Sequence, residues 1–402
     1  MLVLASVFCL ALASMQATAM AETKSAAPSA GDNLVSDKAP EALDDGWATA
    51  APSEAGFDPS GLEELTRAVE SGAIHNVHAV VIEHAGRLVY ERYFKGPDER
   101  WGDSIGQVAF TRDSLHDLRS VSKSVATALL GIALAGTHRE ALDRPITFYF
   151  EDLKGSFGPG VEKVTLKHVL TMTAGLEWNE MTVPYTSADN DEIRLYYTSD
   201  PVALVLARPV RDPVGTKWYY NGGLSQVVAG VIRRKTGEPI HKYAEKVLFG
   251  PLGITTYEWL GSSKWKAGTP PSAASGLRMR ARDLAKIGSV YLHKGAWNGR
   301  QVIPAEWIEL SGQSHVEKIP WGRSTGAYGY GFMWYPGRLK GPEGYRLIRA
   351  AGNGDQRIFI LPELKLSITM FAGNYNVYTH RSDARVLERV MAAFKRPKTD
   401  AQ

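Results

Sequence analysis

The residues with the clearest potential for chemistry are a serine and a lysine three positions apart, Ser120 and Lys123. The apolar run that begins at Val125 predicts a helix, and residues three apart lie on one face of a helix, so the hydroxyl and the amine can meet. Backbone N–H groups and the positive end of the helix dipole would stabilise an oxyanion beside the serine. Burial disfavours the charged lysine, so a buried Lys123 would tend towards the neutral form that accepts a proton.

This spacing does not by itself identify a nucleophile. Serine and lysine are common residues, and a chain of this length contains about one such pair by chance. A second pair, Ser263 and Lys266, is followed by Gly, Thr and two prolines, so no helix is expected to carry it. Ser120 could equally be an ordinary helix-capping serine. The choice between cap and nucleophile depends on other motifs.

Two such motifs supply the groups that a serine and lysine pair would need. Tyr219 and Asn221 form the only Tyr-x-Asn of the chain and precede an apolar helical run. A phenol there can relay the serine proton to a leaving group, and the amide can orient a substrate carbonyl. Further on, the small residues before Asn353 would let its N–H approach a substrate and complete an oxyanion hole with the Ser120 N–H. The alternative for the first motif is a glycine-rich turn in which Tyr219 only packs. The alternative for the second is a bare turn.

In their order along the chain, these motifs resemble those of class C β-lactamases and penicillin-binding proteins, and most of all the esterase and 6-aminohexanoate-dimer hydrolase branch. The motifs are Ser120-Val-Ser-Lys123, Leu170-Thr-Met-Thr-Ala-Gly-Leu176-Glu-Trp178, Tyr219-Tyr-Asn221, Tyr328-Gly-Tyr-Gly-Phe-Met-Trp-Tyr335 and Ala351-Gly-Asn-Gly-Asp-Gln356. The resemblance extends from about residue 55 to residue 395. It implies a β-lactamase/transpeptidase-like fold and a serine hydrolase that forms an acyl-enzyme without metal or cofactor.

The resemblance also implies a role for each motif residue. Ser120 is the nucleophile, Lys123 its base and Tyr219 the phenol that relays the proton. The expected oxyanion and substrate-binding residues are Asn221, Gly352 and Asn353. Trp178, Tyr185 and Asp191 are assigned to the leaving-group side from their place between the motifs.

One departure from the family pattern bears on the substrate. β-Lactamases and cell-wall peptidases of the family carry Lys-Thr-Gly or His-x-Gly on the strand, where this chain has Ala350-Ala351-Gly352. The cation that would bind a substrate carboxylate is missing, and strand alternation points Arg349 to the opposite face of the sheet. Small esters or amides are therefore favoured. The alternatives are a β-lactamase or D-Ala-D-Ala carboxypeptidase, and a non-catalytic module that binds cell-wall fragments.

The elements that would position these groups form one α/β (α+β) domain. A helix is predicted over 57–72, a hairpin from Val77–Ile82 and Leu88–Phe94, strands at Tyr345–Ala350, Ile358–Leu361 and Leu366–Phe371, and a last helix at Asp383–Phe394. Further helices are predicted at Ser122–Ala135, Leu166–Met172, Pro201–Ala207, Leu224–Lys235 and Ala281–Leu292. The simplest assembly is a five-stranded antiparallel sheet with helices on both faces (residues 51–135 and 276–396) and a helical lobe (residues 136–275), within a hydrolase domain of residues 51–396.

Composition and missing motifs exclude other classes of protein. The 402 residues are 44% hydrophobic. The chain has 46 lysines and arginines and 43 aspartates and glutamates, without a run of like charge, so no nucleic-acid partner is expected. Neither a Gly-x-Ser-x-Gly elbow nor a His-Glu-x-x-His motif occurs. Only His75 and His78 have helical spacing, and they precede a strand, so no metal site is predicted. The expected partner is a small ester or amide, and nothing indicates an oligomeric state.

Residues 1–21 predict a secretory signal. They carry an apolar stretch of about a dozen residues and end in Ala19-Met20-Ala21, a pattern of small residues typical of cleavage after Ala21 or Ala19. A flexible lead-in is expected over residues 22–50. The mature protein is expected to be periplasmic or secreted and to have no membrane span. Cys9 is the only cysteine and would leave with the signal, which excludes a cysteine nucleophile and disulfides. A membrane anchor or a buried N-terminal helix is the alternative.

Overall fold

The structure is a computed structural model that describes residues 37–261, 270–322, 324–341 and 343–395. The predicted signal sequence, most of the predicted lead-in, and the second serine and lysine pair lie outside these residues. Within the described ranges, no helix combines the length and the apolar character needed to cross a bilayer.

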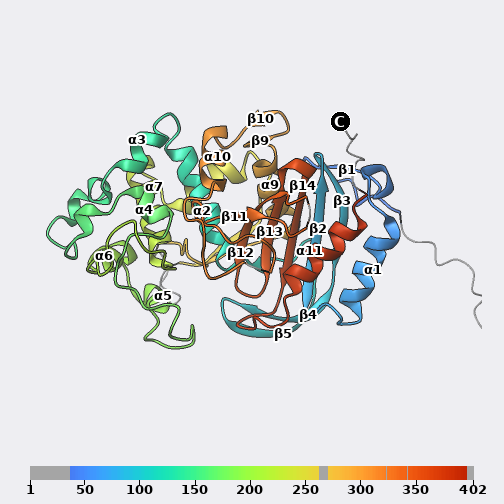
Figure 1. Cartoon of the computed structure of the whole chain (residues 1–402), viewed down its shortest axis with the longest axis horizontal. Helices are drawn as coiled ribbons and strands as arrows, with labels where there is room; N and C mark the ends of the chain where they lie inside the picture. The colour runs from blue at the N-terminus through green and yellow to red at the C-terminus, as the bar shows by residue number, and fades with distance from the viewer. Residues whose placement is uncertain (1–36, 262–269, 323, 342, 396–402) are drawn as a thin grey trace, which may run out of the picture. The chain divides into compact units, whose positions relative to one another are not determined.

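A seven-stranded sheet forms the centre of the fold, with the strand order β1-β3-β2-β14-β13-β12-β11 (Figure 1). The strands are β1 (Ala48–Thr49), β2 (Val77–His84), β3 (Arg87–Tyr93), β11 (Tyr335–Arg338), β12 (Arg346–Gly352), β13 (Gln356–Leu361) and β14 (Leu366–Ala372). β2 pairs with β14, so the first hairpin and the last three strands join in one antiparallel sheet, as predicted. The predicted number of five is too low, because the short strands β1 and β11 extend the sheet at its two edges.

The edge strand β1 falls inside the predicted flexible lead-in. Residues 48–49 pair with β3 in parallel, and the neighbouring Trp47 is only 5% exposed. The segment from Asp37 to Ala50 also supplies Asp45, which forms an ion pair with Arg282. This part of the lead-in therefore packs against the domain, and a pairing of only two residues leaves no periodic pattern in the sequence.

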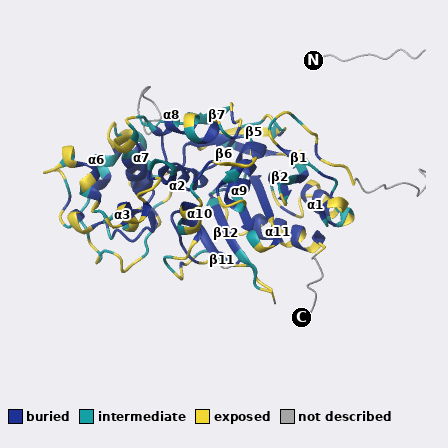
Figure 2. Cartoon of the chain, turned by 90° about the horizontal axis from the view of Figure 1, so that it is seen from above, coloured by how far each residue is buried: buried dark blue, intermediate teal, exposed yellow. Residues whose placement is uncertain are grey.

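Helices cover both faces of the sheet. On one face lie α1 (Pro59–Glu70) and α11 (Ser382–Ala393), which pack against each other, and on the other lies α9 (Ala281–Leu292), which packs against β2, β13 and β14 (Figures 1 and 2). Asp58 caps α1 by accepting a hydrogen bond from the Ser60 N–H at 3.1 Å.

Helix α2 (Val121–Ala133) lies between the sheet and the helical segments, because it contacts both β12 and α7. Each of its residues from Val121 to Gly131 is buried, and α2 is dark blue in Figure 2. A helix that is packed on all sides holds its first turn rigidly. The remaining helices are α3 (His138–Asp143), α4 (Leu166–Leu170), α5 (Asp191–Arg194), α6 (Pro201–Leu206), α7 (Gly223–Thr236), α8 (Ile240–Ala244) and α10 (Ala305–Gly312).

A separate hairpin of β4 (Lys95–Arg100) and β5 (Asp103–Ala109) was not predicted. Its residues are mostly polar, with Gly and Pro in β4, so the alternation that predicts a strand is absent. The other short strands are β6 (His116–Asp117), β7 (Tyr257–Trp259), β8 (Leu277–Met279), β9 (Ala296–Trp297) and β10 (Arg300–Gln301). β6 pairs with β8 and leads directly into the turn before α2.

Candidate active site

The first turn of α2 brings Ser120 and Lys123 together. Lys123 Nζ lies 3.2 Å from Ser120 Oγ and donates a hydrogen bond to the carbonyl oxygen of Ala274 at 2.8 Å. The lysine side chain is only 2% exposed, whereas Ser120 is partly exposed. A buried amine thus faces an accessible hydroxyl, at the spacing that the sequence indicated.

A strained residue shapes the turn before the serine. Arg119 has a φ of +48°, a left-handed conformation that costs a non-glycine residue about 1 kcal/mol or more. Its guanidinium holds the conformation, because it lies 3.3 Å from Asp117 and donates to Glu99 at 2.9 Å. Backbone strain of this kind is typical of functional sites.

The end of β12 lies against the same turn. A Cβ atom on Gly352 would lie 2.3 Å from the carbonyl oxygen of Leu118, so only glycine fits there. The next residue, Asn353, is fixed by two hydrogen bonds of 2.8 Å with Asn376. Neither the Ser120 N–H nor the Asn353 N–H finds an acceptor among the described residues. The two N–H groups predicted to form an oxyanion hole are therefore not engaged elsewhere in this part of the chain.

The Tyr-x-Asn segment packs beside the lysine. The Tyr219 N–H donates to the Met172 carbonyl at 3.0 Å, while the half-buried Tyr219 hydroxyl makes no hydrogen bond to a described residue. Asn221 Oδ1 accepts a hydrogen bond from the Leu224 N–H at 3.2 Å, at the start of α7. The residue between them, Tyr220, presents its ring to the lysine, with Nζ 5.0 Å from the ring centroid. This contact was not predicted, because the Tyr-x-Asn motif is defined by its first and third residues.

Two buried carboxyl groups next to Lys123, those of Glu180 and Glu192, were not predicted either. Glu192 Oε2 lies 3.8 Å from Lys123 Nζ, and Glu192 shares a hydrogen bond with Glu180. Burial raises the pKa of Glu180 well above its usual value, and the negative charge of Glu192 raises it further. At Glu192 burial also acts against ionisation, but Lys123 and hydrogen bonds from Glu180 and Ser275 outweigh it and lower the pKa. Glu180 therefore carries the proton and Glu192 the negative charge.

Glu180 connects two of the sequence motifs. Its Oε2 accepts hydrogen bonds from Trp178 Nε1 at 2.7 Å and from the Gly222 N–H at 2.6 Å, and its Oε1 accepts one from the Tyr185 hydroxyl at 2.8 Å. Trp178 is buried and Tyr185 half-buried. Two of the three residues assigned to the leaving-group side, Trp178 and Tyr185, thus bind Glu180, and Glu180 holds the backbone that follows Asn221. Glu180 was not predicted as a site residue, because a glutamate at this place in the sequence is typical of an exposed position.

The arginines near the end of β12 are bound to other groups. Arg349 is buried, donates to Thr325 Oγ1 at 3.0 Å and lies 3.7 Å from Asp383, and burial lowers its pKa to about 10. Arg357 forms ion pairs of 2.8 Å with both Asp355 and Asp383. Arg349 is therefore directed away from the site, in agreement with the strand alternation.

Asp191 is likewise held by ion pairs. Its Oδ1 lies 2.8 Å from Arg208 and 3.1 Å from Arg194, and its side chain is 4% exposed. This carboxylate, assigned from the sequence to the leaving-group side, fixes the start of α5, the helix that presents Glu192.

Comparison with known proteins places the chain in a family. The model of the beta-lactamase family matches residues 64–389, so the chain belongs to this family. Esterase EstB of Burkholderia gladioli is 24% identical over 216 residues, which are 52% of this chain and 53% of EstB. The 6-aminohexanoate-dimer hydrolase of Paenarthrobacter ureafaciens is 28% identical over 219 residues, which are 50% of this chain and 52% of that protein. The chain spans about half the length of these curated relatives.

A solved structure extends the likeness over more of the fold. A penicillin-binding protein homologue from Caulobacter crescentus has a TM-score of 0.64 with this chain at 18% identity, covering 83% of this chain and 97% of its own. The resemblance drawn from the motifs and the predicted β-lactamase/transpeptidase-like fold are both confirmed.

Proposed function

We propose that this protein is a serine hydrolase that cleaves small esters or amides through an acyl-enzyme on Ser120. The observation that carries the proposal is the buried Lys123 amine 3.2 Å from the Ser120 hydroxyl. The names of the relatives, an esterase and a 6-aminohexanoate-dimer hydrolase, support ester or amide bonds as the substrate class. The predicted signal sequence supports export to the periplasm or beyond.

In the first half of the reaction the serine takes up the acyl group. Lys123 accepts the proton of Ser120 as Oγ bonds to the substrate carbonyl carbon. The N–H groups of Ser120 and Asn353 donate to the carbonyl oxygen as it becomes negative. The C–O or C–N bond then breaks, and the proton passes from the lysine through the Tyr219 hydroxyl to the leaving alcohol or amine.

In the second half water releases the acyl group. A water molecule loses a proton to the same base and attacks the ester carbon, the oxyanion forms again, and Ser120 regains its proton as the acid leaves. Glu192 contributes in both halves, because its negative charge 3.8 Å away stabilises the ammonium that Lys123 becomes. The amide of Asn221, two residues after Tyr219, orients the substrate carbonyl.

The residues at the end of β12 support an uncharged substrate. Ala350 and Ala351 offer no cation, and Arg349 is bound to Thr325 and lies close to Asp383. A substrate carboxylate of the kind found in penicillins and cell-wall peptides would therefore meet no counter-charge from these residues. Small esters and amides without a carboxylate next to the scissile bond fit better.

The proposal is tested by the hydrolysis of p-nitrophenyl butyrate. Ser120→Ala should lower the rate by about 10³-fold or more, with an unchanged circular dichroism spectrum. The matched control is Ser71→Ala, an exposed serine that should retain full activity. Undiminished turnover by Ser120→Ala would reject the nucleophile. Rapid hydrolysis of nitrocefin would favour a β-lactamase, and saturable binding of cell-wall fragments without turnover would favour a binding module.

A further inference from the structure

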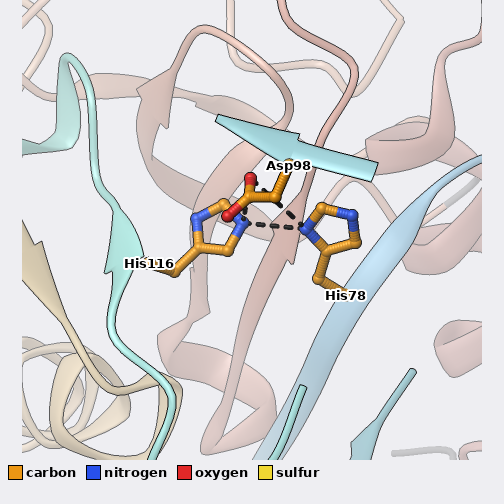
Figure 3. A group of neighbouring side chains, drawn as sticks. All are labelled: His78, Asp98 and His116. Atoms are coloured by element: carbon orange, nitrogen blue, oxygen red, sulfur yellow. Dashed lines mark hydrogen bonds and ion pairs between the residues drawn. The ribbon is translucent and has the colours of Figure 1, made fainter. Parts of the chain in front are cut away.

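Three side chains from separate strands meet in the interior of the domain (Figure 3). They are His78 of β2, Asp98 of β4 and His116 of β6, and all three side chains are 0% exposed. His116 stands four residues before the serine and 38 residues after His78. The fold therefore brings together two imidazoles and a carboxylate whose spacing in the sequence does not predict a common site.

Hydrogen bonds at the outer side of each ring determine which nitrogen carries a proton. His116 Nδ1 lies 3.0 Å from the Asp117 carbonyl oxygen, which can only accept, so Nδ1 donates. His78 Nε2 lies 2.9 Å from Asn76 Oδ1, and the orientation of this amide is set because Asn76 Nδ2 donates to the Pro97 carbonyl at 3.1 Å. A neutral imidazole has one N–H, so the inward nitrogens, His78 Nδ1 and His116 Nε2, both present lone pairs.

The inward atoms form a triangle of electron donors. The two nitrogens are 2.9 Å apart, and Asp98 Oδ1 lies 3.3 Å from the His116 nitrogen and 3.8 Å from the His78 nitrogen. Donor atoms this close repel one another unless a cation lies between them. A point equidistant from the three corners lies about 2.0 Å from each, which matches Zn–N and Zn–O bond lengths. A proton shared by the two nitrogens would lie between them, so Asp98 Oδ1 would receive no hydrogen bond from either ring.

Neighbouring groups hold the three side chains in this arrangement. The His78 ring stacks on Phe110 with centroids 4.2 Å apart, and the His116 ring stacks on Phe371 at 4.6 Å. The Tyr375 hydroxyl donates to Asp98 Oδ1 at 2.8 Å, while Asp98 Oδ2 is buried without a hydrogen-bond partner in the described part of the chain. Outer hydrogen bonds of this kind orient the ligands of protein metal sites.

We propose that His78, Asp98 and His116 bind one divalent transition-metal ion, for which Zn²⁺ is the best match. The site is structural, because its ligands are fully buried and, in the described part of the chain, none of them forms a hydrogen bond or an ion pair with Ser120 or Lys123. Within the same ranges, the β4–β5 hairpin has no strand pairing with the main sheet. An ion bound by these three side chains would fix that hairpin to β2 and to the segment before Ser120.

The direct test is the metal content of the full chain, purified without a histidine tag. Elemental analysis should find about one transition-metal ion per chain. Asp98→Asn keeps the side-chain shape and should lose the ion, as should His116→Gln. The matched control is His380→Ala, which removes half of the His75–His380 ring pair (centroids 4.0 Å apart, with His75 exposed) and should leave the metal content unchanged.

A second measurement uses only the natural sequence, because variants of buried residues can fail to fold. After removal of the metal with 1,10-phenanthroline, calorimetry should show uptake of about one Zn²⁺ per chain, and the melting temperature should rise by several degrees. Two results would overturn the proposal. The first is that the natural protein contains no transition metal and that its chelator-treated form takes up no Zn²⁺. The second is that a folded Asp98→Asn variant still contains a full equivalent of the metal ion.

Discussion

Replacement of Glu192 by glutamine removes the negative charge beside the proposed base and leaves the side-chain shape almost unchanged. The glutamine side chain retains an oxygen that can accept the hydrogen bond of 2.7 Å from the Ser275 hydroxyl. Its NH₂ group cannot accept the hydrogen bond that Glu180 donates, and the larger loss is the attraction between the Glu192 carboxylate and the Lys123 ammonium that forms when the lysine takes up the serine proton. We expect Glu192→Gln to slow acylation strongly.

The distance between the two groups sets the size of the effect. Opposite unit charges 3.8 Å apart attract by about 4 kcal/mol at an effective dielectric constant of about 20. At about 1.4 kcal/mol for each factor of ten, complete loss would slow the reaction about 10³-fold. The lysine is only partly protonated in the transition state, so the expected loss in kcat/KM is about 10- to 100-fold.

The matched variant is Glu180→Gln. Burial and the charge of Glu192 raise the pKa of Glu180, so this carboxyl is already neutral and glutamine replaces it without a change in charge. Its amide oxygen can accept from Trp178 and Gly222. Its NH₂ group can donate to Glu192 and to the Tyr185 hydroxyl oxygen, so the hydrogen bond with Tyr185 reverses its direction. We expect a loss of only a few-fold. The assay is kcat/KM for p-nitrophenyl butyrate, with melting temperatures measured in parallel.

Two outcomes would refute this reasoning. A folded Glu192→Gln variant with kcat/KM within about twofold of the natural protein would show that the carboxylate does not assist the base. A larger loss for Glu180→Gln than for Glu192→Gln, at similar melting temperatures, would show that the proton and the charge are assigned to the wrong carboxyl groups.

Three further predictions follow from other contacts. Tyr219→Phe should lower kcat by about 10²-fold and Tyr220→Phe much less, because only the ring of Tyr220 faces the lysine; equal losses in steady-state assays would contradict this. Gly352→Ala should cost about 1 to 3 kcal/mol in urea unfolding and reduce activity, because its Cβ would meet a backbone carbonyl at 2.3 Å; an unchanged midpoint would disprove the close approach. The hydrogen bond to Glu83 raises the pKa of His293, so this pair stabilises the fold below the ordinary histidine pKa of about 6.5 and loses its effect as pH rises through the folded-state value. His293→Gln should therefore lower the melting temperature at about pH 5.5 and hardly at about pH 9; the reverse pattern would contradict the sign.

The parts of the fold that were predicted have strong local patterns. β2 and β3 are rich in β-branched and aromatic residues and flank a two-residue turn, in which Ala85 and Gly86 have φ values of +49° and +85°. The β4–β5 hairpin lacks such a pattern, because β4 contains Gly96 and Pro97 and β5 is almost fully exposed. Its position is determined by contacts with distant parts of the chain, which a single sequence does not reveal.

The residues of the candidate site likewise fall into those that the sequence predicts and those that it does not. Ser120 and Lys123 were found because one turn of a helix brings them together. Glu180 and Glu192 come from two different segments, and their effect arises only when both are buried beside the lysine. The histidines of the proposed metal site are 38 residues apart, and a search for helical spacing cannot detect them.

The central claim, a nucleophilic serine activated by its buried lysine, is tested most directly by intact-protein mass spectrometry after treatment with a fluorophosphonate. The account predicts one covalent adduct, located at Ser120 by peptide mapping, which is absent in Ser120→Ala and strongly slowed in a folded Lys123→Met variant. An unlabelled natural protein, or an adduct that persists in Ser120→Ala, would contradict it.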